Sequence, residues 1–408
     1  MVVSYTMILN NIIIDNMIMI LAVNLLLSNF CSFHIHALKV PKSPIKVFYD
    51  SKNSLHRDIQ YHPEQPSRID KCLDVLKSYH QENEEKHKLH HVPLFELINV
   101  SRTVSSSVEQ QTSQIYYFSL PFLSKARNIL TEIHTEELVS SIETTCHNSR
   151  QRRINEGKDP LGFIGNLDHD TFLTTESYDV CLRATAIWMH CVDIVLSNGA
   201  TSTAMALTRP PGHHATKTLP NGFCIFNFAA AAAVHALTVP TCNKVTIIDW
   251  DVHYGQGVAD IVSKNPNIRY VSMHQVPAFP YLGQSRSIIG EHSNIKTVPI
   301  QAESTWACGY ESAFVEQVLP FCYEDGVWEA DLVIVCAGYD ALSSDELASC
   351  NLNGEDYGKM TTLLKNHLED QFNHIGLVFG LEGGYQLNDS PGGNLADAVL
   401  ETLKAAGK

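Results

Sequence analysis

The stretch Val245–Gly257, VTIIDWDVHYGQG, joins a short apolar run to a group of carboxylate and imidazole side chains. Val245–Ile248 is apolar and β-branched without alternation, the pattern of a strand buried on both faces of a parallel sheet. Asp249, Asp251 and His253 would lie where this strand ends. Layered α/β folds bind ligands just beyond the carboxyl ends of their strands, so the stretch predicts both a fold class and the place of a site.

The rest of the chain alternates similar short apolar runs with longer helical patterns. The predicted strands are residues 46–49, 204–208, 245–249, 269–273, 332–337 and 376–380. The predicted helices are residues 177–196, 226–237, 309–321, 355–373 and 394–406. This alternation predicts an α/β fold, a single domain with a mostly parallel central sheet and helices on both faces. We interpret the polar stretches 78–88 and 146–158 as surface insertions.

The N-terminal residues differ from everything that follows. Residues 7–27 are largely apolar but are interrupted by polar residues, and no Lys or Arg precedes Lys39. The run therefore falls short of the roughly 20 apolar residues of a spanning helix. We favour a signal or targeting segment, residues 1–40, directed to a plastid, a mitochondrion or the secretory route. The alternative is a misassigned start codon and a cytoplasmic or nuclear protein. One folded domain, residues 45–408, would follow, without a membrane span.

Composition excludes several classes of protein. Hydrophobic residues make up 44% of the chain and charged residues 18%, a balance typical of a globular domain. The formal charge of -15 argues against direct nucleic-acid binding, which requires a basic surface. The 11 cysteines are odd in number and none are spaced as CxxC, so we expect free buried thiols rather than a disulfide framework.

Three further predicted strands are followed by polar motifs. RPPGHH follows residues 204–208, GYD follows residues 332–337, and LEGGY ends in Tyr385 just after residues 376–380. Each motif alone is weak, because 20 histidines make about one His-His pair by chance and an Asp-x-His is usually a capped turn. Together they predict a single site at the carboxyl ends of the strands, lined by carboxylates, imidazoles and a phenol.

The residue types at this predicted site suit a catalytic metal. Asp251 and His253, two apart in an extended segment, would project to the same side. With Asp340 they offer two carboxylates and one imidazole, and three protein ligands leave the fourth position of a tetrahedral zinc open. Zinc lowers the pKa of bound water to about 7 and polarises a carbonyl oxygen. The sequence therefore predicts a zinc-dependent amidohydrolase.

The remaining polar residues could supply the other parts of amide hydrolysis. His213 and His214 could divide the tasks of base and acid, since histidine titrates near neutral pH. Asp249 could orient one of these imidazoles. The Tyr385 hydroxyl could donate a hydrogen bond to the oxyanion that forms on the attacked carbonyl.

Five motifs in this order carry a resemblance to a known family. They are RPPGHHA (209–215), GFCIFN (222–227), DWDVHYGQG (249–257), GYDAL (338–342) and LEGGY (381–385). They resemble the histone deacetylase family of the arginase–deacetylase superfamily, and are closer to its class II-type members. The similarity also includes HPEQPSRI (62–69), ARNILTEIHTEELV (126–139) and DHDTFLTTESY (168–178), so it extends from about residue 47 to the C-terminus.

The resemblance implies zinc-dependent hydrolysis of the acetyl amide of acetyl-lysine in proteins, histone or non-histone. The alternative within the family is an acetylated polyamine or another small acylated amine. One zinc per chain would be bound by Asp251, His253 and Asp340. The family's assignments make His214 the principal base and acid. His213, supported by Asp249, would be the electrostatic partner. Tyr385 would donate a hydrogen bond to the oxyanion.

The resemblance also implies substrate and potassium sites. Gly222 and Phe223 would line the channel for the lysine stem, opposite Phe279, and Asp170 would hold substrate backbone amides at the rim. Family members bind a structural potassium ion beside the zinc. The residues at the matching positions are Asp249, Asp251 and His253 (the last two through their backbone) and Ser272.

This chain departs from the family pattern in three places, the third being Glu346, which follows Asp345 near the rim and could meet a cationic substrate. Tyr254-Gly-Gln256 replaces the usual His-Gly followed by Asp or Asn, which changes the partner of the predicted base. Residues 279–283, FPYLG, replace Phe-Pro-Gly-Thr-Gly and alter the rim. Leu347 falls where polyamine deacetylases need an acidic gatekeeper, which favours protein substrates.

Two functions of other classes remain for comparison. A module that binds acyl-lysine without turnover fits less well, because Tyr385 and the full set of metal ligands are present. An arginase-like manganese ureohydrolase would need a binuclear, aspartate-rich site.

Overall fold

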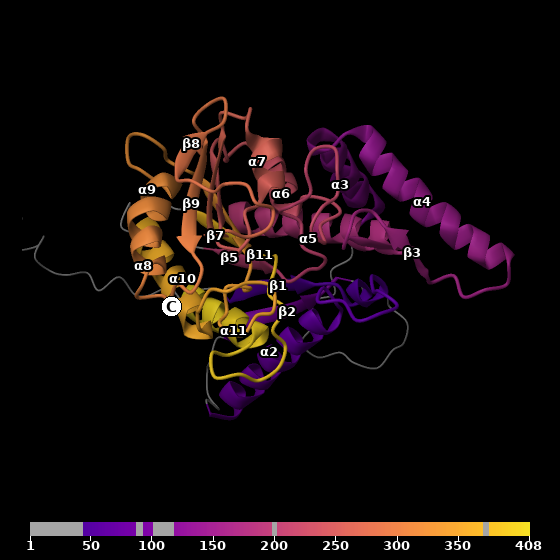
Figure 1. Ribbon diagram of the computed structural model, residues 1–408, viewed down its shortest axis with the longest axis horizontal. Helices are drawn as coiled ribbons and strands as arrows, with labels where there is room; N and C mark the ends of the chain where they lie inside the picture. The colour runs from indigo at the N-terminus through magenta and orange to yellow at the C-terminus, as the bar shows by residue number, and fades with distance from the viewer. Residues whose placement is uncertain (1–43, 87–92, 101–117, 198–201, 370–374) are drawn as a thin grey trace, which may run out of the picture. The chain divides into compact units, whose positions relative to one another are not determined.

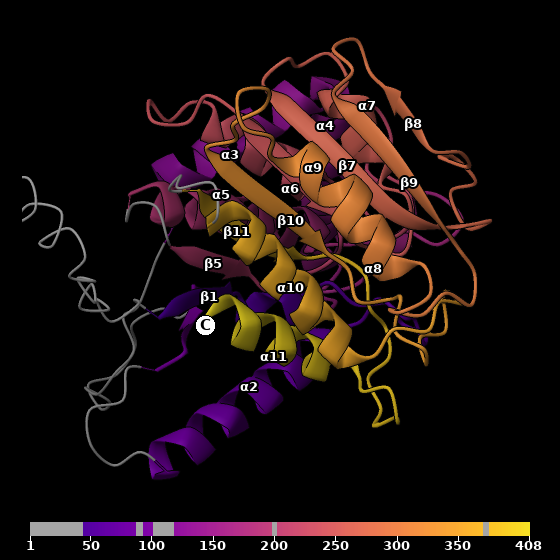
Figure 2. The same ribbon diagram turned by 90° about the vertical axis from the view of Figure 1, so that its left-hand side faces the viewer.

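A parallel sheet organises the chain in a computed structural model that describes residues 44–86, 93–100, 118–197, 202–369 and 375–408. Within these residues the sheet has nine strands in the order β2-β1-β5-β11-β10-β6-β7-β9-β8 (Figures 1 and 2). In that order they are Phe95–Asn99, Ile45–Tyr49, Thr203–Ala206, Gly376–Leu381, Leu332–Ala337, Val245–Asp249, Ile268–Val276, Ile295–Gln301 and Ser287–Ile289. Only β8 pairs antiparallel, with β9. A separate antiparallel pair is formed by β3 (Phe163–Asn166) and β4 (Phe172–Thr174).

Both faces of the sheet are buried, as the non-alternating strands predict. In β10 every residue is buried, and successive side chains enter two different hydrophobic clusters. Val333 and Val335 belong to one cluster, and Leu332 and Ile334 to the other. A period of two places alternate side chains on opposite faces, so an all-apolar strand needs a helical layer on each side.

Helices supply both layers (Figure 2). One cluster combines a sheet face with α2 (Ser67–Lys86), α8 (Tyr310–Ala313), α9 (Leu319–Cys322), α10 (Gly354–Glu369) and α11 (Leu395–Ala406). The other combines the opposite face with α3 (Leu120–Ile133), α4 (Glu136–Asn155), α5 (Ser177–Ser197), α6 (Phe228–Ala236) and α7 (Gln256–Val262). Two single turns, η1 (Ser51–Leu55) and the π-helical η2 (Phe314–Val318), complete the described elements. The predicted α/β fold with a mostly parallel sheet is confirmed.

The structure corrects several local predictions. The polar stretches interpreted as surface insertions are helical: residues 78–86 continue α2, and most of residues 146–158 form the end of α4. In α2 the side chains of Ile69, Cys72 and Leu76 are buried at helical spacing, while polar residues occupy the outer face. The predicted helix 309–321 is three consecutive short helical segments. Strands β2, β3, β4, β8 and β9 were not predicted.

The predicted targeting segment, residues 1–40, lies outside the described residues. All described elements fall within one unit, Pro44–Lys408. One of its helices, α5, is apolar and long enough to cross a membrane by length and composition. Most of that helix is buried, and it contacts α3, α6 and β5 in the core, which explains its apolar composition.

Candidate active site

The motifs predicted to form one site follow four neighbouring strands of the sheet. Strands β5, β11, β10 and β6 are adjacent and parallel, so their carboxyl ends lie along one edge. The segment after β5 carries the histidine pair, and the segment after β11 carries Tyr385. The segments after β6 and β10 carry the predicted metal ligands. Because parallel strands end on the same side, the sheet order brings together residues as far apart in sequence as His213 and Tyr385.

Asp251, His253 and Asp340 form one buried cluster. One ligand atom from each lies within 4.8 Å of the others. The His253 Nδ1 atom is 3.0 Å from Asp340 Oδ2 and 3.3 Å from Asp251 Oδ1. Backbone N–H groups hold both carboxylates, since Gly383 donates to Asp251 Oδ2 at 2.8 Å and Val252 donates to Asp340 Oδ1 at 2.9 Å. The three side chains are thus fixed with their ligand atoms facing a common point.

Glycines make room for these carboxylates. A Cβ atom on Gly338 would lie 2.1 Å from Asp251 Oδ2, and one on Gly383 would lie 2.3 Å from Asp340 Oδ2. Both distances are far inside van der Waals contact. The glycines of GYD and LEGGY are therefore required by the close approach of the backbone to the carboxylates.

The charge of the cluster also suits a cation. Burial, and next the charge of Asp251, raise the pKa of Asp340. Burial opposes ionisation of His253, but the charge of Asp340 and hydrogen bonds to both carboxylates raise its pKa well above the usual value. Two buried carboxylates this close repel one another unless a positive charge lies between them. Two carboxylates and an imidazole with backbone support match the donors of a three-ligand zinc site.

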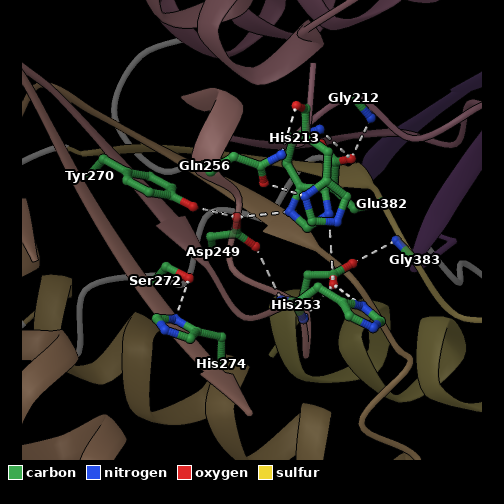
Figure 3. A network of polar contacts seen from close by, with 12 residues as sticks. Gly212, His213, Asp249, His253, Gln256, Tyr270, Ser272, His274, Glu382 and Gly383 are labelled. Carbon is green, nitrogen blue, oxygen red and sulfur yellow. Dashed lines mark hydrogen bonds and ion pairs between the residues drawn. The ribbon is translucent and has the colours of Figure 1, made fainter. Parts of the chain in front are cut away.

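His213 is coupled to Asp249. Its Nδ1 atom lies 3.0 Å from Asp249 Oδ2, which also accepts a hydrogen bond of 2.7 Å from the Tyr270 hydroxyl (Figure 3). Burial lowers the pKa of His213, but the charges of Asp251 and Asp249 outweigh it and raise the pKa to about 10. These two carboxylates therefore favour the charged form of His213. Tyr270, on β7 beside β6, had no motif to mark it in the sequence.

His214 has a different environment from its neighbour. Its Nδ1 atom lies 2.7 Å from the Gln256 Oε1 atom, a neutral amide oxygen. Burial, then the charges of His213 and His253, lower the pKa of His214 well below the usual value. The two imidazoles of the pair, with ring centroids 3.9 Å apart, thus have pKa values shifted in opposite directions. A neutral imidazole can accept a proton, which is the requirement for a general base.

Glu382 supports the turn that carries the pair, a role that the sequence did not suggest. Its Oε2 atom accepts hydrogen bonds from the backbone N–H groups of Gly212 (2.6 Å) and His213 (3.1 Å). Burial raises the pKa of this carboxyl to about 7. On the other side of the turn, the Asn227 side chain caps α6 at Ala230 and donates to Ala215 O at 3.0 Å. The pair is therefore held from two elements.

The predicted channel residues lie beside the pair. A Cβ atom on Gly222 would lie 2.8 Å from both the His214 ring and the Phe279 ring. The Phe279 ring meets the His214 ring edge to face at 4.9 Å, and the Phe223 ring meets the Tyr385 ring in the same way at 5.6 Å. Phe279 therefore lies beside His214, and Phe223 lies beside Tyr385.

Asp170 is connected to Phe223 through the ring of His62. Its backbone oxygen is 2.9 Å from His62 Nε2, and the His62 ring packs against the Phe223 ring at 4.7 Å. Burial, and next the charge of Asp168, raise the pKa of the half-buried Asp170 carboxyl. Asp168 in turn accepts a hydrogen bond from Gly222 N at 3.2 Å. Asp170 is therefore placed near the channel residues, as the sequence predicts.

Tyr385 is held as a protonated phenol. Burial raises its pKa well above the usual value, so the hydroxyl can donate a hydrogen bond. Its backbone N–H donates to Asp345 Oδ2 at 2.6 Å, and the Arg68 guanidinium lies 4.6 Å from its ring centroid. Arg68 also donates to Gly384 O at 2.8 Å. The sequence marked Arg68 only through the HPEQPSRI motif and did not suggest this contact.

The residues predicted to bind potassium lie at the end of β6, in the turn that follows it, and on the neighbouring strand β7. Asp249 and Ser272 are register partners on β6 and β7, and the Asp249 Oδ1 atom accepts a hydrogen bond from Asp251 N at 3.2 Å (Figure 3). The Ser272 hydroxyl contacts His274 Nδ1 at 2.9 Å. A carboxylate, a hydroxyl and the backbone oxygens of this turn are the hard oxygen donors that an alkali cation prefers.

Comparison with known proteins identifies the family of this site. A family model described as a histone deacetylase domain matches residues 62–403. An uncharacterised protein of Synechocystis is 42% identical over 59% of this chain and 73% of its own length. Human polyamine deacetylase HDAC10 is 28% identical over 67% of this chain, which spans only 38% of that relative. Chloroplastic histone deacetylase 14 of Arabidopsis thaliana is 27% identical, covering 88% and 76% of the two chains.

A solved structure shares the fold. The crystal structure of the HDA15 HD domain superposes with a TM-score of 0.68, covering 90% of this chain and 88% of that one at 24% sequence identity. The family model covers most of the chain, including every motif placed at the strand ends above. The chain therefore belongs to the histone deacetylase family.

Proposed function

We propose that residues 45–408 form a zinc-dependent deacetylase domain that hydrolyses the acetyl amide of acetyl-lysine in proteins. The observation that carries this proposal is the buried cluster of Asp251, His253 and Asp340 beside a pair of histidines whose Nδ1 atoms face different partners, the Asp249 carboxylate and the Gln256 amide oxygen. Membership of the family supports deacetylation as the reaction. The metal and the protein substrate are our inference from the donor set and from Leu347 at the gatekeeper position.

The groups around the cluster divide the work of amide hydrolysis. Zinc bound by the three ligands would polarise the substrate carbonyl and acidify water. His214, held neutral, takes a proton from the attacking water and returns it to the departing amine. His213, held positive by Asp249 and Asp251, stabilises negative charge that develops beside it. Tyr385 donates its hydroxyl proton in a hydrogen bond to the oxyanion. Potassium at Asp249 and Ser272 would brace the turn that carries Asp251.

Acetylated polyamines are the second candidate substrate. The human relative named as a polyamine deacetylase supports it, and so does an exposed carboxylate near Tyr385. Glu346 follows Asp345 in sequence, and its Oε1 atom accepts a hydrogen bond of 2.8 Å from the exposed Tyr61 hydroxyl. This carboxylate has no cation partner among the ion pairs of the described residues and could attract a second ammonium group.

A direct comparison of substrates tests the proposal. Turnover of acetyl-lysine peptides and of mono-acetylated polyamines should be measured on the same preparation, before and after removal of metal by a chelator. We expect higher kcat/KM on the peptides, loss of activity with the chelator, and recovery on addition of zinc. Higher kcat/KM on the polyamine would replace the first substrate class by the second. Full activity in metal-free protein would refute the zinc mechanism for both.

Tyr385→Phe should reduce kcat by about 10²–10³, since it removes one donor to the oxyanion. The ring contacts with Phe223 and Arg68 remain, so the fold and metal content should be unchanged. The measurement is steady-state turnover with metal analysis on the same sample. Tyr357→Phe is a matched control, because it removes a buried hydroxyl from α10 outside the predicted site. Near wild-type turnover in Tyr385→Phe would exclude Tyr385 from the mechanism.

Gln256→Asp should move the acid limb of the rate profile to higher pH. A carboxylate beside His214 favours its charged form and raises its pKa. The base must be neutral to act, so it would then be lost to protonation at a higher pH than in the wild type. The measurement is kcat/KM against pH for both proteins. An unchanged acid limb would show that His214 is not the group whose protonation limits the rate.

Residues 1–40 are proposed to direct the chain to an organelle. The relative named as chloroplastic supports a plastid as one destination. Fusion of residues 1–45 to a fluorescent reporter should redirect the reporter from the cytosol, as judged by microscopy in plant cells. A reporter that remains cytosolic would favour the alternative of a misassigned start codon.

A further inference from the structure

The Gln256 side chain makes three polar contacts that use both ends of its amide. Its Oε1 atom lies 2.7 Å from His214 Nδ1. Its Nε2 atom donates to the His214 backbone oxygen at 3.2 Å and to Asn221 Oδ1 at 3.3 Å. The two hydrogens of the NH₂ group are therefore both used, and the oxygen faces the imidazole (Figure 3).

The contact with a backbone oxygen identifies which end of this amide is the NH₂ group. A carbonyl oxygen only accepts hydrogen bonds, so the end of Gln256 that faces His214 O must be the NH₂ group. The Oε1 atom must then face Nδ1, and Nδ1 must carry the imidazole proton. His214 is thereby held as the Nδ1–H tautomer, with the lone pair on Nε2. A rotated amide would instead present N–H to Nδ1 and force the proton onto Nε2, where a general base has to accept one.

Close packing brings Gln256 to this position. It begins α7, and a Cβ atom on the next residue, Gly257, would lie 2.3 Å from the Ala215 oxygen. Val258 N donates to the His213 oxygen at 3.1 Å. The first turn of α7 is therefore packed directly on the turn of the histidine pair, which leaves the amide of Gln256 to be oriented by its hydrogen bonds.

Asn221 is held in place independently of its side chain. Its backbone N–H donates to the Cys224 oxygen, and the Cys224 N–H donates back to the Asn221 oxygen, both at 2.9 Å. This reciprocal bridge spans Gly222 and Phe223, the predicted channel wall. A substitution of the Asn221 side chain leaves both backbone bonds available, so its effect on Gln256 can be separated from its effect on the loop.

We propose that Asn221 is a positioning residue that acts on His214 through Gln256. Its oxygen is the second acceptor for the Gln256 NH₂ group and holds the amide in the orientation that keeps the proton of His214 on Nδ1. An Asp at position 256, with two equivalent oxygens and no N–H, would need no such partner. The neutral Gln256 does need one, because its two ends have opposite hydrogen-bonding character. The consequence for catalysis rests on the proposed function, whereas the tautomer does not.

The tautomer can be measured without turnover. Long-range ¹H–¹⁵N spectra of the imidazole nitrogens distinguish Nδ1–H from Nε2–H, and the His214 signals can be assigned by their absence in His214→Ala. We expect the Nδ1–H form alone in wild type and in Asn221→Asp, which retains an acceptor. Asn221→Leu should show a mixture of tautomers, because it removes the acceptor at similar volume. A single unchanged Nδ1–H tautomer in Asn221→Leu would overturn the proposal.

Kinetics supply a second, independent reading. Loss of one oriented hydrogen bond in Asn221→Leu should lower kcat about 3- to 10-fold with little change in KM. Thr216→Val is the matched control, since it weakens the same loop at Leu219 without touching Gln256. A change in KM alone, or an equal loss of kcat in Thr216→Val, would indicate damage to the channel loop and contradict the positioning role.

A double-mutant cycle distinguishes coupling through Gln256 from a structural effect. In the Gln256→Asp background, Asn221→Leu should cost less than 2-fold in kcat, because a carboxylate has no N–H to orient. The same 3- to 10-fold loss in both backgrounds would show that Asn221 acts by another route and overturn the proposal. A mixed His214 tautomer in Asn221→Leu without any effect on kcat would retain the positioning role but refute His214 as the base.

Discussion

Replacing Asp251 or Asp340 with Ala is expected to abolish bound metal and activity together. Each variant removes one of the three proposed ligands and leaves the other buried carboxylate without the cation that would balance its charge. Wild-type protein should contain about one zinc per chain, as expected of a single three-ligand catalytic site. The measurement is metal analysis by mass spectrometry, with turnover determined on the same samples.

A buried carboxylate outside the cluster provides the control for these variants. Asp356 is 3% exposed and accepts a hydrogen bond of 2.9 Å from Asn353 N at the start of α10. Asp356→Ala should lower thermal stability but retain metal. Metal retained in Asp251→Ala or Asp340→Ala would contradict the assignment of ligands. Metal lost equally from Asp356→Ala would show that general destabilisation, and not ligand removal, is the cause.

His214→Ala should lower kcat by about 10²–10⁴, because it removes the group that moves the proton. Burial and the charges of the neighbouring imidazoles lower the pKa of His214, which favours the neutral form that a base requires. Since His214 is not a proposed ligand, metal content should be unchanged. The measurement is the pH dependence of kcat/KM, in which the acid limb that reports the base should disappear.

His134→Ala is a suitable control for the loss of a buried imidazole. His134 is 1% exposed, and its ring links Thr216 O to Asn227 N near the histidine pair without facing the ligand cluster. Its loss should affect stability more than the shape of the pH profile. A His214→Ala variant with near wild-type kcat and an unchanged profile would require another base, and His213 would then be the residue to test.

Much of the fold follows from local sequence. The run Leu332–Ala337 is apolar at every position, and a strand of this kind is stable only with helices on both faces. Each deciding strand is followed directly by its polar motif, so the edge of the sheet that carries the site could be predicted as well. The predictions failed where polarity hid an amphipathic helix, as in α2 and α4. They also failed in β9, where polar residues interrupt the apolar run.

The buried strands, and the polar residues that follow their carboxyl ends, could be predicted from the sequence alone. Both depend on hydrophobic periodicity and polarity, which are local properties of the chain. Tertiary structure alone decided the strand order β5-β11-β10-β6, which brings Asp340 to His253 and Tyr385 to Phe223. It also placed the Asn221 side chain, 35 residues from Gln256, within hydrogen-bond distance of the amide that contacts His214. Such contacts depend on how α7 packs against the turn of the histidine pair, and packing distances of a few ångströms between distant segments are not encoded in any local pattern.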